Sequence, residues 1–546
     1  MSAGWDTTRR GEFAARLWRK DATSWSADAA HQKVAANRLG WLDLPRTMPA
    51  EVAGLEAFAA EVRADGFTQA VLLGMGGSSL APEVMRRMLG VASGALDLAV
   101  LDNTSPAAVR AVAGSHDPRR TLFLVSSKSG GTIEVASFER YFFEWVSAAR
   151  GAEAGRAFVA ITDPGSPLSR LAAGRGYRRT FLNPPDVGGR YSALSLFGLV
   201  PAALIGADLG ALLESATREL DEAWRGPSGG AGVDFGAAIG AAALAGQDKL
   251  VLAFGSRWAP FGAWVEQLVA ESTGKDGRGV VPVDGEAPRS ATLACPDRAF
   301  VATPDLDPDL GRRIAHRAGP AWLLDLESPR DLGAAFLRWE IATAAAAAVM
   351  GVDPFDEPNV SEAKQATQTV LERALADGRF PEEAPLAAGA GWSLHASGPA
   401  ERALRAAGAH EPGAALEALL ALARPGDYLA LLAYLNVTPE LHDSLQRVRA
   451  AAGARSGLAT TLGIGPRFLH STGQLHKGGP DTGLFLQITA EEGPDVGIPG
   501  QPYSFGMLRR AQAMGDFETL ARRGRRAIRL HLEDEAIARL GTLAGL

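Results

Sequence analysis

Residues 69–79 read QAVLLGMGGSS, a run of apolar residues that stops abruptly in glycines and serines. An unbroken apolar run of this length is typical of a strand that is buried on both faces of a parallel sheet. The amphipathic pattern that resumes after Ser79 predicts a helix directly behind the turn. A helix that begins at the end of a strand presents free backbone N–H groups and a positive dipole end, which favour a phosphate.

The same alternation of apolar runs and helical patterns continues along the chain and predicts an α/β fold. Strands are expected at 69–73, 96–101, 121–125 and 158–162 in a first block, and at 249–254, 280–283, 298–302 and 322–326 in a second. Helices are expected between them, including 132–146 and 332–350. Beyond a segment rich in proline and glycine at 380–390, further strands are expected at 427–434, 459–463, 484–489 and 527–532.

This pattern divides the chain of 546 residues into four regions. A helical lead-in covers 1–45, and two doubly wound parallel-sheet domains, each with three αβα layers, cover 46–212 and 213–379. The region 380–546 forms an α/β C-terminal extension. A chain of this length normally holds more than one domain.

Composition excludes several classes of function. A formal net charge of −7 gives no basic surface for nucleic acid. The single Cys295 excludes an intramolecular disulfide and fits a reducing, cytoplasmic location. The N-terminus lacks the apolar core of a signal peptide, the alanine-rich stretch 342–349 is too short to cross a bilayer, and polar or proline residues break the run 194–213. We therefore expect no membrane segment.

A second strand-to-helix turn strengthens the case for an anion. The strand TLFLV is followed by SSKSGGTIE, residues 126–134, in which a lysine accompanies several hydroxyl side chains. Two such turns at the carboxyl ends of parallel strands converge where ligands of open α/β sheets bind. The turn at 74–79 lacks the third glycine of the dinucleotide fingerprint, and no GxxxxGK[ST] motif occurs, so a phosphate ester fits better than a nucleotide.

The segments GMGGSSLAP and SKSGGTIE resemble the phosphate-binding domain of sugar isomerases (the SIS fold). Their order and spacing are similar to those of the phosphoglucose isomerase family, in particular the isomerase half of fused transaldolase–phosphoglucose isomerase proteins. The resemblance implies interconversion of glucose 6-phosphate and fructose 6-phosphate through a cis-enediolate, without a cofactor. By this resemblance the substrate phosphate is held by Gly77, Ser78, Ser127, Lys128, Ser129 and Thr132.

By this resemblance, two further motifs supply residues that act on the reacting carbons of the substrate. GGRYSALS, residues 188–195, matches the GGRxS motif, whose arginine, here Arg190, approaches the reacting carbons. A guanidinium fixed beside a developing enediolate would stabilise its charge. VEQLVAESTGKDG, residues 265–277, resembles the segment whose glutamate is the catalytic base, which assigns Glu271 that role and Gln267 a substrate contact. A glutamate at the end of an apolar helix face is well placed for a raised pKa.

The segment DPFDEPNVSEAK, residues 353–364, resembles the motif that ends in an active-site lysine, here Lys364, which aids opening of the sugar ring. The sequence departs from the family here, because Glu357 stands where the family has glutamine, and Pro358 and Asn359 replace tryptophan and glycine. An extra carboxylate near a phosphate dianion would be repelled unless it is paired. Whether Glu357 contacts substrate is left open.

The histidine for ring opening lacks its usual family motif. Between Glu271 and Lys364 the chain offers only His316, which has a different context. A dense polar segment follows at 465–487, GPRFLHSTGQLHKGGPDTGLFLQ, and we expect His470 or His476 to supply the imidazole. A spacing of six residues without an adjacent third ligand makes these two histidines a poor metal site, so no metal is expected.

Other functions fit parts of the pattern. A sugar-phosphate sensor would use the same phosphate turns and would not need Glu271 or Lys364. An isomerase for a related aldose phosphate such as mannose 6-phosphate would differ only at the reacting carbon. The isomerase half of a glucosamine 6-phosphate-forming amidotransferase would need a glutaminase domain, for which no catalytic N-terminal cysteine exists. The family resemblance also implies a homodimer, with a small-molecule sugar phosphate as the partner in binding.

Overall fold

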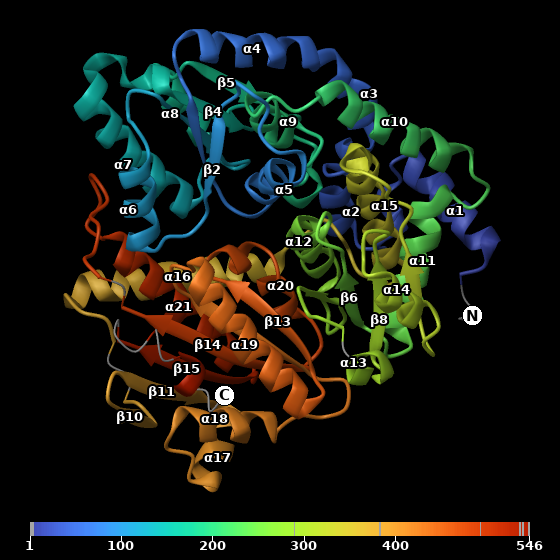
Figure 1. Cartoon of the computed structure of the whole chain (residues 1–546), viewed down its shortest axis with the longest axis vertical. Coiled ribbons are helices and arrows are strands. Elements are labelled where there is room, and N and C mark those ends of the chain that lie inside the picture. The colour runs from blue at the N-terminus through green and yellow to red at the C-terminus, as the bar shows by residue number, and fades with distance from the viewer. Residues whose placement is uncertain are drawn as a thin grey trace.

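In the computed structural model, which describes residues 5–288, 290–381, 384–491, 493–533, 537 and 540–543, three β-sheets are each surrounded by helices. Figure 1 shows the first sheet at the top of the molecule, the second at the right and the third at the lower left. The helices α12 and α20 lie near the middle of this view, where the three parts meet. The α/β fold expected from the sequence is confirmed.

The first sheet has five parallel strands in the order β2-β1-β3-β4-β5. Its strands are β1 (Gln69–Gly74), β2 (Asp97–Leu101), β3 (Thr121–Ser126), β4 (Phe158–Thr162) and β5 (Arg179–Leu182). In this order the connections change direction between β1 and β3, which leaves a crevice at their carboxyl ends. The helices of this part are α4 (Val52–Ala64), α5 (Leu80–Leu89), α6 (Pro106–Ser115), α7 (Ile133–Arg150), α8 (Pro167–Gly174) and α9 (Leu196–Leu204). In Figure 1, α6, α7 and α8 lie left of the sheet, and α5 and α9 lie right of it.

The second sheet repeats this arrangement with four parallel strands in the order β7-β6-β8-β9. The strands are β6 (Lys249–Ala253), β7 (Val281–Asp284), β8 (Arg298–Ala302) and β9 (Ala321–Leu323). Its helices are α10 (Leu209–Arg225), α11 (Gly230–Leu244), α12 (Gly262–Thr273), α13 (Ser290–Ala294), α14 (Pro308–Ala315) and α15 (Leu332–Met350). The N-terminal helices are α1 (Thr7–Trp18), α2 (Ala29–Ala36) and α3 (Leu44–Thr47).

Helix α15 belongs to the core of this part. Among the described residues, 329–350 form the one helix that is long and apolar enough to cross a membrane, and 78% of its most apolar window is buried inside the molecule. A Cβ added at Gly236 of α11 would lie 2.0 Å from the carbonyl oxygen of Ala342, so glycine is needed for α11 and α15 to pack this closely.

The third sheet is mixed, with the order β10-β11-β15-β14-β12-β13. Its strands are β10 (Ala387–Gly389), β11 (Trp392–Ser397), β12 (Tyr428–Tyr434), β13 (Ala459–Ile464), β14 (Gly483–Ala490) and β15 (Arg526–Leu532), of which the last four run parallel. Its helices are α16 (Pro358–Asp377), α17 (Gly398–Ala407), α18 (Pro412–Leu420), α19 (Pro439–Ser456), α20 (Gly473–Gly478), α21 (Phe505–Arg522) and α22 (Leu540–Leu543).

The strands that the sequence did not predict are the edge strands β5 and β10, and β11, which lies next to β10. Strand β5 is short and partly exposed, and β11, WSLHAS, mixes polar with apolar residues, so neither forms an unbroken apolar run. Strand β10 lies within the segment 380–390 that we expected to be a linker, of which 382–383 lie outside the described residues. The domain boundaries themselves stay a prediction.

Candidate active site

The two glycine- and hydroxyl-rich turns follow β1 and β3 and therefore flank the crevice of the first sheet. Residues Gly76–Ser78 form a short 3₁₀ turn, η4. A Cβ at Gly77 would lie 2.1 Å from the carbonyl oxygen of Gly189, and one at Gly76 would lie 2.9 Å from the side-chain nitrogen of Gln267. These glycines therefore let the turn approach both the GGRYS segment and helix α12.

The turn after β3 is stabilised by hydrogen bonds to its own hydroxyl groups. Ser127 Oγ lies 3.0 Å from Thr132 Oγ1 and accepts a hydrogen bond of 3.1 Å from the Gly130 N–H. Ser129 is exposed. The Lys128 side chain binds other groups. Its Nζ lies 2.5 Å from Asp163 Oδ2 and donates a hydrogen bond of 2.9 Å to the Pro185 carbonyl. Its charge is thus already paired in this structure.

Glu271 lies in the last turn of α12, with Gln267 one turn earlier on the same face. The Glu271 side chain contacts two groups. Its Oε1 lies 3.1 Å from Arg190 Nη1, and its Oε2 accepts a hydrogen bond of 3.0 Å from the Gln267 side chain. Glu271 is 7% exposed. Burial raises the pKa of Glu271 and nearby Glu357 raises it further, and together they outweigh the opposing effect of Arg190. A raised pKa suits a carboxylate that must take up a proton.

Arg190 is fixed by contacts along its whole guanidinium. Its Nε donates to Ser272 Oγ at 2.9 Å, and its Nη2 donates to the carbonyls of Pro354 and Asp356 at 2.6 and 2.9 Å. Its Nη1 lies 3.1 Å from both Glu271 and Glu357. Burial opposes the charge of Arg190, but the two carboxylates raise its pKa above the usual value, so it stays a cation.

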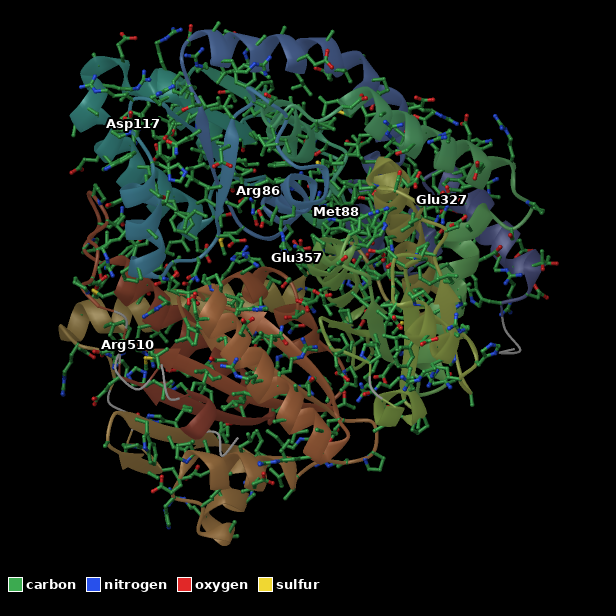
Figure 2. The ribbon with its side chains drawn as sticks, in the orientation of Figure 1. Arg86, Met88, Asp117, Glu327, Glu357 and Arg510 are labelled. Carbon is green, nitrogen blue, oxygen red and sulfur yellow. The ribbon has the colours of Figure 1, made fainter. Side chains whose placement is uncertain are left out.

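Glu357 is therefore paired with Arg190, as the repulsion argument required of a carboxylate at this position. Figure 2 places Glu357 near the middle of the molecule. The loop that contains Glu357 is held by Lys275, the lysine of the ESTGK segment. The Lys275 Nζ donates hydrogen bonds to the carboxylate and to the backbone carbonyl of Asp356, both at 2.6 Å. Lys275 thus has a structural role that the sequence did not reveal.

His470 enters this site from the third part of the chain. Its backbone carbonyl accepts a hydrogen bond of 2.8 Å from Gln267, and its Nε2 lies 2.9 Å from Glu134 Oε1. Burial would raise the pKa of Glu134, but His470 and Lys364 bring it below its usual value. Lys364, exposed on α16, is thus near enough to contribute to lowering the pKa of the same carboxylate.

Glu134 is the residue at this site that the sequence argument did not assign. It lies in the first turn of α7, directly after the phosphate turn, and is 3% exposed. A second donor, Gln512 of α21, reaches the same oxygen at 2.7 Å. The signal in the sequence was the final glutamate of SKSGGTIE, which resembles an ordinary first-turn acidic residue.

The comparisons with known proteins identify the family of this chain. The model of the phosphoglucose isomerase family matches residues 59–287. A glucose-6-phosphate isomerase from Rubrobacter xylanophilus is 30% identical over 394 residues, which cover 61% of this chain and 89% of the relative. The chain belongs to the glucose-6-phosphate isomerase family.

Solved structures with the same fold include two bacterial proteins. A hypothetical protein from Thermus thermophilus has a TM-score of 0.57 and 24% identity, covering 66% of this chain and 94% of its own. A glucose-6-phosphate isomerase from Chlamydia trachomatis has a TM-score of 0.51 and 21% identity, covering 68% and 79%. At these identities the likeness concerns the fold.

His476, the second histidine considered for this glucose-6-phosphate isomerase family member, lies in a different environment. Its ring packs among Phe485, Phe468 and Tyr428, with centroids 5.2, 6.1 and 6.2 Å away. Burial holds the pKa of His476 well below its usual value, so the ring is neutral. The structure thus brings His470, and not His476, next to Gln267 and Glu134.

The segment with His470 lies beyond residues 59–287, the range that the family model matches, and two pairs of residues dock it on the rest of the chain. Arg467 donates two hydrogen bonds of 2.7 and 2.8 Å to Asp102 at the end of β2. Gln474 bonds with Asn359 in both directions, at 2.8 and 2.9 Å. Asn359 is one of the residues by which this chain departs from the family motif, and its partner comes from the docked segment.

Proposed function

We propose that this chain catalyses the reversible isomerisation of glucose 6-phosphate and fructose 6-phosphate. The observation that carries the proposal is the Glu271 carboxylate, buried at the end of α12 with a raised pKa and fixed between Arg190 and Gln267. A carboxylate of this kind can move a proton between adjacent carbons. Family membership favours this substrate pair over others.

In this mechanism Glu271 removes the proton from C2 of the open-chain aldose and returns it to C1. The negative charge that develops on the enediolate oxygens is stabilised by Arg190, whose orientation is set before substrate arrives. Because the guanidinium is anchored by backbone carbonyls, it needs little reorganisation during the reaction.

Ring opening comes first in this mechanism, because both sugars are mainly cyclic in solution. His470 would move the proton between the ring oxygen and the anomeric hydroxyl, and Glu134, 2.9 Å away, would orient the imidazole and stabilise its charged form. Lys364 would face the ring oxygen from α16. We assign His476 no role in this mechanism, because its neutral ring is enclosed by aromatic side chains.

The phosphate end would lie over the two turns of the first sheet. Ser78, Ser127, Ser129 and Thr132 offer hydroxyls, and the adjoining helix N-termini offer backbone N–H groups. Gly77 allows close approach, while Lys128 adds charge from its pair with Asp163. Anchoring the phosphate holds the distant reacting carbons in position. A cytoplasmic location and a homodimer are part of the same proposal.

The test compares wild type, Glu271→Gln and Glu266→Gln in a chelator-treated assay of fructose 6-phosphate conversion. Glu266 is the matched control on α12, because burial beside Asp284 raises its pKa to about 8 and glutamine replaces an already protonated carboxyl. We expect Glu271→Gln to lose about 10³-fold or more in kcat, as for loss of a general base, and Glu266→Gln to stay near wild type. Full activity in Glu271→Gln would exclude it as the base, and binding without turnover in the wild type would favour a sugar-phosphate sensor.

A further inference from the structure

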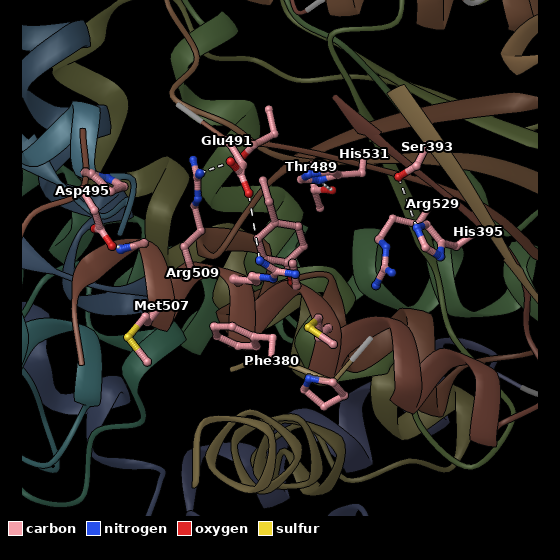
Figure 3. Close-up of a pocket in the computed structure, with 18 of the residues that line it drawn as sticks. Phe380, Ser393, His395, Thr489, Glu491, Asp495, Met507, Arg509, Arg529 and His531 are labelled. Atoms are coloured by element: carbon pink, nitrogen blue, oxygen red, sulfur yellow. Dashed lines mark hydrogen bonds and ion pairs between the residues drawn. The ribbon is translucent and has the colours of Figure 1, made fainter. Parts of the chain in front are cut away.

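A cavity of about 580 Å³ lies in the third part of the chain, between α21 and the sheet (Figure 3). It opens at the carboxyl ends of the parallel strands β12, β14 and β15, where Tyr434, Thr489 and His531 line it. Ligands of α/β sheets bind at this edge, and small-molecule pockets have volumes of about 300–1,000 Å³. None of the residues assigned to isomerisation lines this cavity.

The polar residues of the cavity follow from strand alternation. In β15, RAIRLHL, the residues Ile528, Leu530 and Leu532 pack in the apolar core on one face of the sheet. Arg529 and His531 therefore point to the opposite face, under α21. A sheet face covered by a helix is usually apolar, so two basic side chains in this place need a reason.

Neighbouring strands extend the same polar face. His395 and Ser393 of β11 pair in register with Arg529 and His531, and so share their side of the sheet. On the other flank, Thr489 Oγ1 of β14 lies 2.9 Å from His531 Nδ1. Figure 3 shows these side chains gathered along one wall of the cavity.

Among the described residues that line the cavity, the buried charged side chains are arginines. Arg509 and Arg529 are only 6% and 7% exposed. Arg509 donates to the Ala490 carbonyl at 2.7 Å, and Arg529 lies over the Phe517 ring at 5.0 Å. The described carboxylates of the lining are peripheral. Glu491 is 74% exposed and lies 4.0 Å from Arg510, while Asp495 accepts hydrogen bonds from the Ser504 hydroxyl and from the Gly506 N–H at the start of α21.

We propose that this cavity is a second anion site, which binds an organic phosphate. The planar guanidinium groups of Arg509 and Arg529 match the geometry of phosphate oxygens. The imidazoles and hydroxyls on the sheet supply further hydrogen bonds. Opposite them, Phe380, Met507 and Met514 form an apolar wall for the carbon skeleton of the ligand.

The experiment counts the sites on the full chain by equilibrium dialysis with radiolabelled phenyl phosphate, which carries an apolar body and one phosphate. We expect two sites in the wild type, one at the turns of the first sheet and one in this cavity. Arg529→Met should weaken the second site by about tenfold or more and leave isomerase turnover unchanged. Ser127→Ala should weaken only the first site.

Two further variants guard against misreading. Arg522→Met removes an arginine from the same helix outside the cavity and should keep both sites. Ser393→Trp fills the cavity without removing a charge and should abolish binding at the second site. If a thermal melt shows that Arg529→Met does not fold, the result with Ser393→Trp tests the proposal in its place. A single site in the wild type that survives Arg529→Met and Ser393→Trp would overturn the proposal, as would no binding at about 10 mM, tenfold above a weak Kd of about 1 mM.

Discussion

Replacing Glu134 by glutamine tests the contact between this carboxylate and His470. The side chain is 5% exposed and accepts hydrogen bonds from His470 and Gln512, at 2.9 and 2.7 Å. Glutamine keeps the size of the side chain and an oxygen for Gln512 but removes the charge. A hydrogen bond to a charged group contributes about 1.5–3 kcal/mol, against about 0.5–1.5 for a neutral one. A difference of about 1.5 kcal/mol corresponds to about a tenfold loss in kcat/KM.

The assay follows the conversion of glucose 6-phosphate and of its C2-deuterated form. If His470 opens the ring and Glu134 supports it, ring opening becomes slower than proton transfer in Glu134→Gln, and the isotope effect on kcat/KM falls towards one. Glu139→Gln on the same helix is the control, because Glu139 bonds with Arg175 and Tyr177 away from the site. Wild-type rates together with an unchanged isotope effect in Glu134→Gln would refute the reasoning.

Three further predictions concern neighbouring groups. Glu357→Gln removes a carboxylate that raises the pKa of Glu271, so the acid limb of the kcat/KM profile should move to lower pH; an unmoved limb would argue against Glu271 as the titrating base. His476→Phe should retain activity within about twofold and change unfolding free energy by less than about 1.5 kcal/mol, and loss of turnover with normal melting would return His476 to the mechanism. Arg467→Met should lower the free energy of unfolding in urea by about 2 kcal/mol, less than the about 3–5 for a fully buried pair, because Arg467 is 36% exposed. Adding Asp102→Asn should recover most of that loss, whereas equal stability of all three proteins would mean that the pair does not hold the segment in place.

The sequence predicted best those elements whose signal is local. Buried parallel strands appear as continuous apolar runs, so β1, β3, β4 and β8 begin at the expected residues. The two turns were visible because glycine and hydroxyl residues follow those runs directly. Strands at or next to a sheet edge, such as β5 and β11, are partly exposed, so their residues are mixed and the apolar pattern is lost.

The site was less predictable where distant residues meet. Arg467 and Asp102 are 365 positions apart, and their pairing depends on how the third part docks on the first. The same holds for the two histidines, because His470 and His476 lie in one polar segment and only the docked structure separates a ring beside Glu134 from one among aromatic side chains. Their roles in catalysis stay predictions until the variants are measured.

The position of His470 in the last third of the chain has a consequence for biosynthesis. Domains generally fold as units, N-terminal first, during synthesis, so the parts that hold the phosphate turns, Arg190 and Glu271 can fold before His470 has been translated. A nascent chain could bind sugar phosphate without opening its ring. With His470 as the ring-opening group, isomerisation would begin only when the segment behind β13 has docked on the first part of the chain, so the onset of activity would report that docking.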